Sequence, residues 1–270
     1  QATPRQPDAF AAVMEDLGRS LGAGAPLIVA RQFFTEMAEP SAESGAAQLP
    51  AVVGLIDGLR GRAEFKSRPA AAVFATFETA AVDRIFSAAQ TLATDEGAPK
   101  RQRLSAVALL GNATFERSGA TLGQLLDARQ PPELQLQAVR ALDRLGDPRG
   151  AELLVLEKNW TRYTASVRES VVTTLSSKPK MTTVLFAAIR AGVVKPAAIS
   201  SPKRTQLLKH ADATIKQAAT ELFQELEGGD RMKIYQAHRE LLAKPGDAAR
   251  GTEVFTRACS ACHTHQGKGG

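Results

Sequence analysis

The sequence predicts an all-α fold built mainly from stacked pairs of helices. Hydrophobic residues make up 44% of the chain and aromatic residues 5%, with Ala and Leu prominent. Ala and Leu lose little side-chain entropy in a helix, and the β-branched and aromatic runs typical of strands are scarce. Apolar residues recur at spacings of three and four, and this pattern itself repeats along the chain.

The first third of the chain has helical periodicity but only weak repeats. Helices are expected near Phe10–Leu21, Pro26–Met37, Pro50–Arg60 and Ala70–Leu92.

The clearest amphipathic segment covers residues 134–145. Leu134, Ala138, Leu142 and Leu145 form one stripe, and the helix should stop at Gly146-Asp147-Pro148 because proline cannot continue the backbone bonding.

The same apolar pattern returns at nearly constant intervals. Ala106, Val107 and Leu110 correspond to Ala138, Val139 and Leu142 at a spacing of 32, and these three correspond to Val171, Val172 and Leu175 at 33. Ala219 and Leu222 correspond to Val172 and Leu175 at a spacing of 47, because an insertion at residues 191–203 lengthens that interval. Partner helices are expected between the repeats, at Leu122–Ala128, Ala151–Lys158 and Thr182–Ile189.

A repeated helix pair cannot bury its apolar face alone, whereas stacked pairs can, so residues 1–243 are expected to form an α-solenoid. The pattern resembles degenerate HEAT repeats. An irregular helical bundle stays open as the alternative, because periodicity alone does not require stacking.

The C-terminal part is predicted to be a separate domain. A last amphipathic helix is expected at Arg231–Leu242, with Asp230 as its N-cap. Lys244-Pro245-Gly246 then has the composition of a linker, so residues 244–270 are assigned to a second domain.

That second domain carries the pentapeptide Cys259-Ser260-Ala261-Cys262-His263, a C-x-x-C-H motif typical of c-type haem attachment. Two thiols three positions apart can each add to one haem vinyl group, and the adjacent imidazole can ligate the iron. Cys259 and Cys262 are therefore candidate attachment residues for haem c, and His263 is the candidate axial ligand of its iron.

Two other uses of these residues remain open. A zinc ion could recruit Cys259, Cys262, His263 and His265, although structural zinc sites usually draw on two separated ligand pairs. A redox-active dithiol would normally lie in a thioredoxin-like βαβ context, and no such pattern surrounds this pair.

The residues around the motif resemble the opening of a class I cytochrome c. Asp247 is a plausible N-cap, Gly251 and Phe255 share a helix face, and residues 267–270 form a glycine-rich segment. The resemblance implies a first helix that packs against a later one, and a distal methionine ligand. Met14, Met37, Met181 and Met232 all precede the motif, so the domain is expected to be truncated and the chain a fragment.

The combination of helical repeats, linker and C-x-x-C-H resembles planctomycete-type haem-binding proteins, and residues 201–215 are similar to their last repeat. The resemblance implies a possible upstream β-propeller similar to sugar dehydrogenases. The electron partner would then be that dehydrogenase domain or a separate redox protein.

Charge and hydropathy limit the other classes of function. The net charge of +6 comes from 34 basic and 28 acidic residues without a long run of one sign, so nucleic-acid binding is not expected. No uninterrupted apolar stretch is long enough to span a membrane. His210 is expected in a loop or at a helix end, and His238 in a solvated position. Trp160 and Tyr163 are expected to anchor helix packing.

The sequence therefore predicts covalent haem c binding and one-electron transfer in the periplasm or another exported compartment, with the repeats as scaffold or docking surface. No catalytic residue is assigned. One alternative is a basic helical-repeat binding module for protein or nucleic acid, with an incidental or zinc-binding C-x-x-C-H. Another is the C-terminal part of a sugar or alcohol dehydrogenase.

Overall fold

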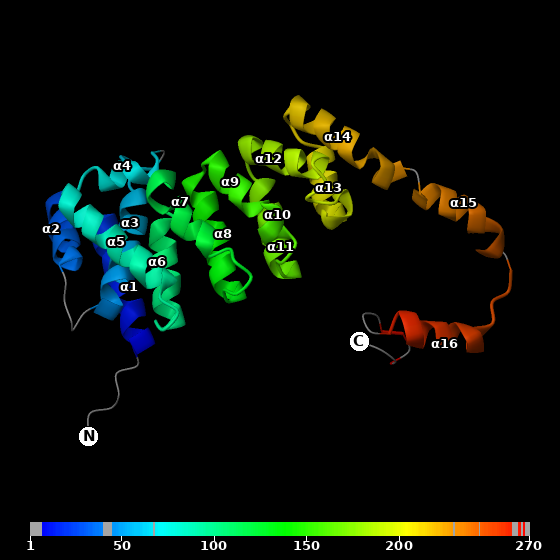
Figure 1. Ribbon diagram of the computed structural model, residues 1–270, viewed down its shortest axis with the longest axis horizontal. Helices are drawn as coiled ribbons and strands as arrows, with labels where there is room; N and C mark the ends of the chain where they lie inside the picture. The colour runs from blue at the N-terminus through cyan, green and yellow to red at the C-terminus, as the bar shows by residue number, and fades with distance from the viewer. Residues whose placement is uncertain are drawn as a thin grey trace, which may run out of the picture. The chain divides into compact units, whose positions relative to one another are not determined.

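The computed structural model describes residues 7–39, 45–66, 68–228, 230–242, 244–260, 264–265 and 267. Within these ranges the chain forms sixteen α-helices, one short 3-10 helix and no β-strand (Figure 1). The prediction of an all-α fold is confirmed at this level. None of the described helices is both long and apolar enough to cross a membrane.

Backbone contacts divide the chain into two units, Gln1–Leu222 and Phe223–Gly270. The first unit begins with five helices that occupy the N-terminal third. They are α1 (Pro7–Gly24), α2 (Leu27–Ala38), α3 (Gly45–Arg60), α4 (Ala70–Phe74) and α5 (Thr79–Thr94).

The rest of the first unit consists of shorter helices in close succession. They are α6 (Lys100–Leu110), α7 (Phe115–Gln124), α8 (Pro132–Leu145), α9 (Pro148–Leu154), α10 (Glu157–Trp160), α11 (Ala165–Leu175), α12 (Pro179–Arg190), the 3-10 helix η1 (Pro196–Ala198) and α13 (Ser201–Leu208). Helix α14 (Ala213–Gly228) runs across the division between the two units.

The helices of the first unit pack in two rows (Figure 1). In one row α3 packs against α6, α6 against α8, and α8 against α11. In the other row α5 packs against α7, α7 against α9, and α9 against α12. Contacts between α5 and α6, α7 and α8, and α11 and α12 join the two rows.

The apolar positions predicted to repeat do form the core. Ala106, Val107 and Leu110 of α6 are fully buried, as are Ala138 and Val139 of α8. Leu142 and the equivalent positions of α11, which are Val171, Val172 and Leu175, are at most 4% exposed. In α14, Ala219 is buried, Leu222 is half-buried, and the following residue, Phe223, is fully buried.

Ion pairs between successive helices also follow the repeat. Lys100 pairs with Glu133 across 33 residues, and Arg149 pairs with Glu116 across 33. Arg117 pairs with Asp83 across 34 residues, and Lys178 pairs with Asp143 across 35. Arg117 lies over the ring of Phe86 and Arg149 over that of Phe115.

Local signals explain where α8 and α9 begin and end. Pro132 occupies the first turn of α8, and Gly146 ends it with a φ of 68°, a left-handed conformation that favours glycine. The Asp147 carboxylate then accepts a hydrogen bond from the Arg149 backbone N–H at 2.9 Å and caps α9.

The single helix predicted at Ala70–Leu92 is wrong, because the chain breaks between α4 and α5. Phe77 lies in this break, is 8% exposed, and stacks on Phe34 with ring centroids 4.1 Å apart. Phe74 and Phe86 pack beside them at 4.9 Å. Burial of this aromatic cluster outweighs the continuous helical pattern.

Three other elements differ in their boundaries from the prediction. Helix α3 begins at Gly45 and continues through Pro50, whose neighbours Leu49 and Ala51 are buried. The predicted partner helices at residues 122–128 and 151–158 are displaced, because α7 ends at Gln124 and α9 at Leu154.

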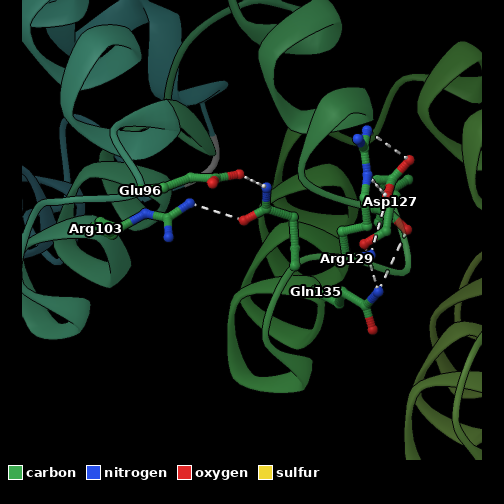
Figure 2. A network of polar contacts seen from close by, with 7 residues as sticks. Glu96, Arg103, Asp127, Arg129 and Gln135 are labelled. Atoms are coloured by element: carbon green, nitrogen blue, oxygen red, sulfur yellow. Dashed lines mark hydrogen bonds and ion pairs between the residues drawn. The ribbon is translucent and has the colours of Figure 1, made fainter.

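Side chains hold the segment between α7 and α8 in a non-helical conformation (Figure 2). The buried Arg103 guanidinium donates to Gln130 at 2.8 Å and to the Ala93 carbonyl at 3.1 Å. The Gln135 amide donates to the Asp127 carbonyl at 2.8 Å, and the Arg129 guanidinium donates to the Asp127 carboxylate at 2.9 Å.

Trp160 and Tyr163 anchor packing as predicted, since they are 5% and 3% exposed and their rings meet edge to face at 6.5 Å. The Asn112-Ala113-Thr114 tripeptide matches a glycosylation acceptor pattern. Asn112 is nevertheless fully buried and accepts a hydrogen bond from Arg60 at 3.2 Å, so its amide is not accessible for modification.

Candidate functional site

The candidate site follows the last helix of the second unit, α16 (Ala248–Ala258). The Asp247 carboxylate accepts a hydrogen bond from the Arg250 backbone N–H at 3.0 Å. The prediction that Asp247 caps this helix is therefore confirmed. The cap fixes where the helix starts, by satisfying one of the free backbone N–H groups of its first turn.

One face of α16 is apolar and leads directly to the first cysteine of the motif. Gly251, Phe255 and Cys259 follow at intervals of four, with Val254 beside them. No residue of α16 is buried, and Val254 is 45% exposed. Phe255 and Cys259 on this face are half-buried, so within the second unit the face is only partly covered.

Cys259 is the residue at which α16 ends. Its backbone N–H donates to the Phe255 carbonyl at 2.8 Å, and the N–H of Ser260 donates to the same carbonyl at 2.9 Å. The Ser260 hydroxyl donates to the Thr256 carbonyl at 2.6 Å. These bonds hold the half-buried Cys259 at the helix end, where Arg257 places a cation favourably with respect to the helix dipole.

Cys262 and His263 lie outside the described residues, so the structure places only the first of the three predicted site residues. His265, the additional zinc ligand considered from sequence, is exposed. Its ring lies 5.8 Å from the ring of Phe255, with an angle of 60° between the two planes. Among the described residues, no group of three His, Cys, Asp or Glu side chains is arranged to hold a metal ion.

Both isolated histidines lie where they were predicted, His210 in the loop after α13 and His238 on a solvated helix surface. The His210 ring accepts a hydrogen bond from the Asp212 backbone N–H at 3.0 Å, and Nδ1 of His238 lies 2.8 Å from the Ile234 carbonyl. His210 is half-buried and His238, in α15 (Asp230–Leu242), is exposed. The predicted Asp230 cap of α15 lies outside the described side chains.

A cavity of about 390 Å³ between α7, α9 and α10 was not predicted from the sequence. Its walls combine cationic side chains with small and aliphatic residues, namely Arg129, Lys158 and Arg162 with Gly119, Ala120, Gly123, Leu153 and Leu156. Arg129 comes from a different segment than Lys158 and Arg162, so only the fold brings it to them. The sequence signal nearest to it is Lys158 and Arg162 on either side of the only tryptophan, Trp160.

No known protein family, curated protein or solved structure matches this chain.

Proposed function

We propose that this protein binds haem c covalently through Cys259 and Cys262, with His263 as an axial ligand of the iron, and transfers single electrons. The observation that supports the proposal is that the C-x-x-C-H motif begins at Cys259, the residue directly after α16, an amphipathic helix with no buried residue. When bound, the haem iron would supply a reversible one-electron couple.

The described residues are compatible with such a group. The Cys259 side chain is half-buried and not fully enclosed, so its thiol could form a thioether with a vinyl carbon. Val254 and Phe255 precede it and expose apolar surface that a porphyrin edge could cover. Asp247 would orient the attachment segment indirectly by fixing the start of α16.

We also propose that residues 1–243 form an array of HEAT-like repeats that acts as a scaffold or docking surface, followed by a cytochrome-like segment. Equivalent buried positions in α6, α8 and α11, together with ion pairs that span 33 to 35 residues, support a repeated helix pair. The electron partner would be a redox protein or a dehydrogenase domain, in the periplasm or another exported compartment.

The test is expression together with the c-type haem maturation machinery, followed by intact mass measurement and an absorption spectrum. We expect a mass gain of one haem and a sharp α-band after reduction. The Cys259→Ala/Cys262→Ala variant should lose both signals, and His263→Ala should lose the native spectrum because an axial ligand is missing.

His265→Ala is the matched control, because this exposed histidine lies outside the pentapeptide. For a haem site it should retain the covalent mass, whereas for a four-ligand zinc site it should lower the metal content. A polypeptide that matures without haem and contains stoichiometric zinc would contradict the proposal.

A further inference from the structure

The cavity between α7, α9 and α10 has an uneven distribution of charge. Asp127 is the only carboxylate in its lining, whereas Arg129, Lys158 and Arg162 are cationic. Asp127 is already engaged, because Arg129 donates to its carboxylate from both the guanidinium and the backbone N–H at 2.9 Å (Figure 2). These hydrogen bonds, with the nearby charge of Arg162, hold the pKa of Asp127 below its ordinary value.

The other two cations have no such partner. Among the described residues, neither Lys158 nor Arg162 forms an ion pair, and both are exposed. Lys158 and Arg162 are four residues apart in the sequence. Asn159 lies between them, and its 7% exposed side chain also lines the cavity. The three cations and one carboxylate of the lining therefore leave an excess of positive charge, and within the described chain Lys158 and Arg162 are not engaged in an ion pair.

The remaining wall is apolar and unobstructed. Leu153 and Leu156 come from α9 and the turn after it, and Leu156 is 38% exposed although it is a large aliphatic residue. Gly123 contributes no side chain. A Cβ there would meet only the Leu153 methyl groups, at 3.4 and 3.8 Å. The absence of a side chain on α7 keeps the apolar part of the cavity open.

We propose that this cavity binds a small organic anion, with a carboxylate or phosphate group held by Lys158 and Arg162 and a short apolar body against Leu153, Leu156 and Gly123. Guanidinium and ammonium groups form strong charge-assisted hydrogen bonds with such oxyanions. The volume of about 390 Å³ is within the usual range for small-molecule sites. This inference does not depend on haem binding.

Octanoate is a suitable probe because it combines a carboxylate with a short apolar chain. Trp160 is the only tryptophan and lies between Asn159 and Arg162, so its fluorescence reports locally on the cavity. We expect saturable octanoate binding with one site per chain. Octanol, which lacks the charge, and inorganic phosphate, which lacks the apolar body, should each bind at least ten-fold more weakly.

The Lys158→Gln/Arg162→Gln variant should weaken octanoate binding at least ten-fold. Arg140→Gln/Lys180→Gln is the matched control, because it removes the same charge from exposed residues that do not line this cavity. Equilibrium dialysis with labelled octanoate checks the affinities without relying on fluorescence, and circular dichroism checks that each variant is folded.

The proposal is overturned if the native protein does not bind octanoate, or if the Lys158→Gln/Arg162→Gln variant binds it as tightly as the native protein does. An equal loss in the control pair would also overturn it, because the effect would then be one of net charge. Equal binding of phosphate or octanol would refute the assigned combination of charged and apolar walls.

Discussion

Gly22 of α1 and Gly58 of α3 lie so close that a Cβ added to Gly22 would be 3.0 Å from the Cα of Gly58. A Cβ on Gly58 would in turn be 2.7 Å from the Ala23 backbone nitrogen. Gly18 and Gly54 make the same kind of approach one turn earlier. Two Gly-x-x-x-Gly segments therefore let the parallel helices α1 and α3 meet backbone to backbone.

Gly22→Ala is expected to lower the free energy of unfolding by about 1–3 kcal/mol, because the two backbones must move apart. Gly123→Ala is the matched control, since its added methyl group meets only Leu153 at 3.4 Å and it lies within helix α7. It should raise stability by about 0.5–1 kcal/mol through helix propensity. Urea denaturation of both variants checks this, and a neutral Gly22→Ala would contradict the close approach.

Tyr163→Phe is expected to stabilise the first unit. The Tyr163 side chain is 3% exposed, and its hydroxyl has no hydrogen-bond partner in the described part of the chain. Burial also raises its pKa well above the ordinary value. Removing an unpaired buried hydroxyl should raise the free energy of unfolding by about 1 kcal/mol. Tyr235→Phe, at a 52% exposed position, should change little, and a destabilised Tyr163→Phe would reveal a partner for the hydroxyl.

Asp247→Ala is expected to fray the start of α16. The lost hydrogen bond to the Arg250 N–H should cost about 1 kcal/mol of local helix stability. Hydrogen exchange at the first amides of α16 should accelerate accordingly, whereas Asp247→Ser should retain most of the protection. If exchange is the same in all three proteins, the Asp247 carboxylate does not set the helix start.

Arg149 is expected to make stability depend on pH in the acid range. Its hydrogen bonds hold the pKa values of Glu116 and Asp147 below their ordinary values of 4.5 and 3.8. Groups with lowered folded-state pKa values contribute stability above their unfolded values, and this contribution is lost as the pH falls through the folded values.

The Tm difference between the native protein and Arg149→Gln should therefore be largest near neutral pH and shrink below about pH 4. The control, Arg140→Gln, removes an exposed arginine that has no ion pair among the described residues, so its Tm difference should stay nearly constant. A pH-independent effect of Arg149→Gln would mean that these carboxylates are not coupled to it.

Helix α8 was predictable because several local signals agree: the apolar stripe from Leu134 to Leu142, the proline in the first turn and the glycine at the end. The break before α5 was not, because burial of Phe77 against Phe34 depends on contacts between distant residues. The Gly-x-x-x-Gly segments are visible in the sequence, but which helices they join depends on the fold.

The candidate haem site is a prediction from the chemistry of five consecutive residues, so Cys259, Cys262 and His263 could be proposed from the sequence without the fold. The Asp247 cap was also local and was predicted correctly. The cavity beside Trp160 could not be predicted in this way. Arg129, Lys158 and Arg162 come from two separate segments, and no periodic pattern relates them.

Helix α8 has its main contacts with α6, α7, α9 and α11, so each helix interacts chiefly with near neighbours in the sequence. Loss of structure at one end should then spread inward one helix pair at a time, while the remaining pairs keep their own buried core. The amide hydrogens at the ends of the first unit would consequently exchange before those at its centre, and proteases would cleave the ends first. The ion pairs of Arg117 and Arg149 would be among the last contacts to open.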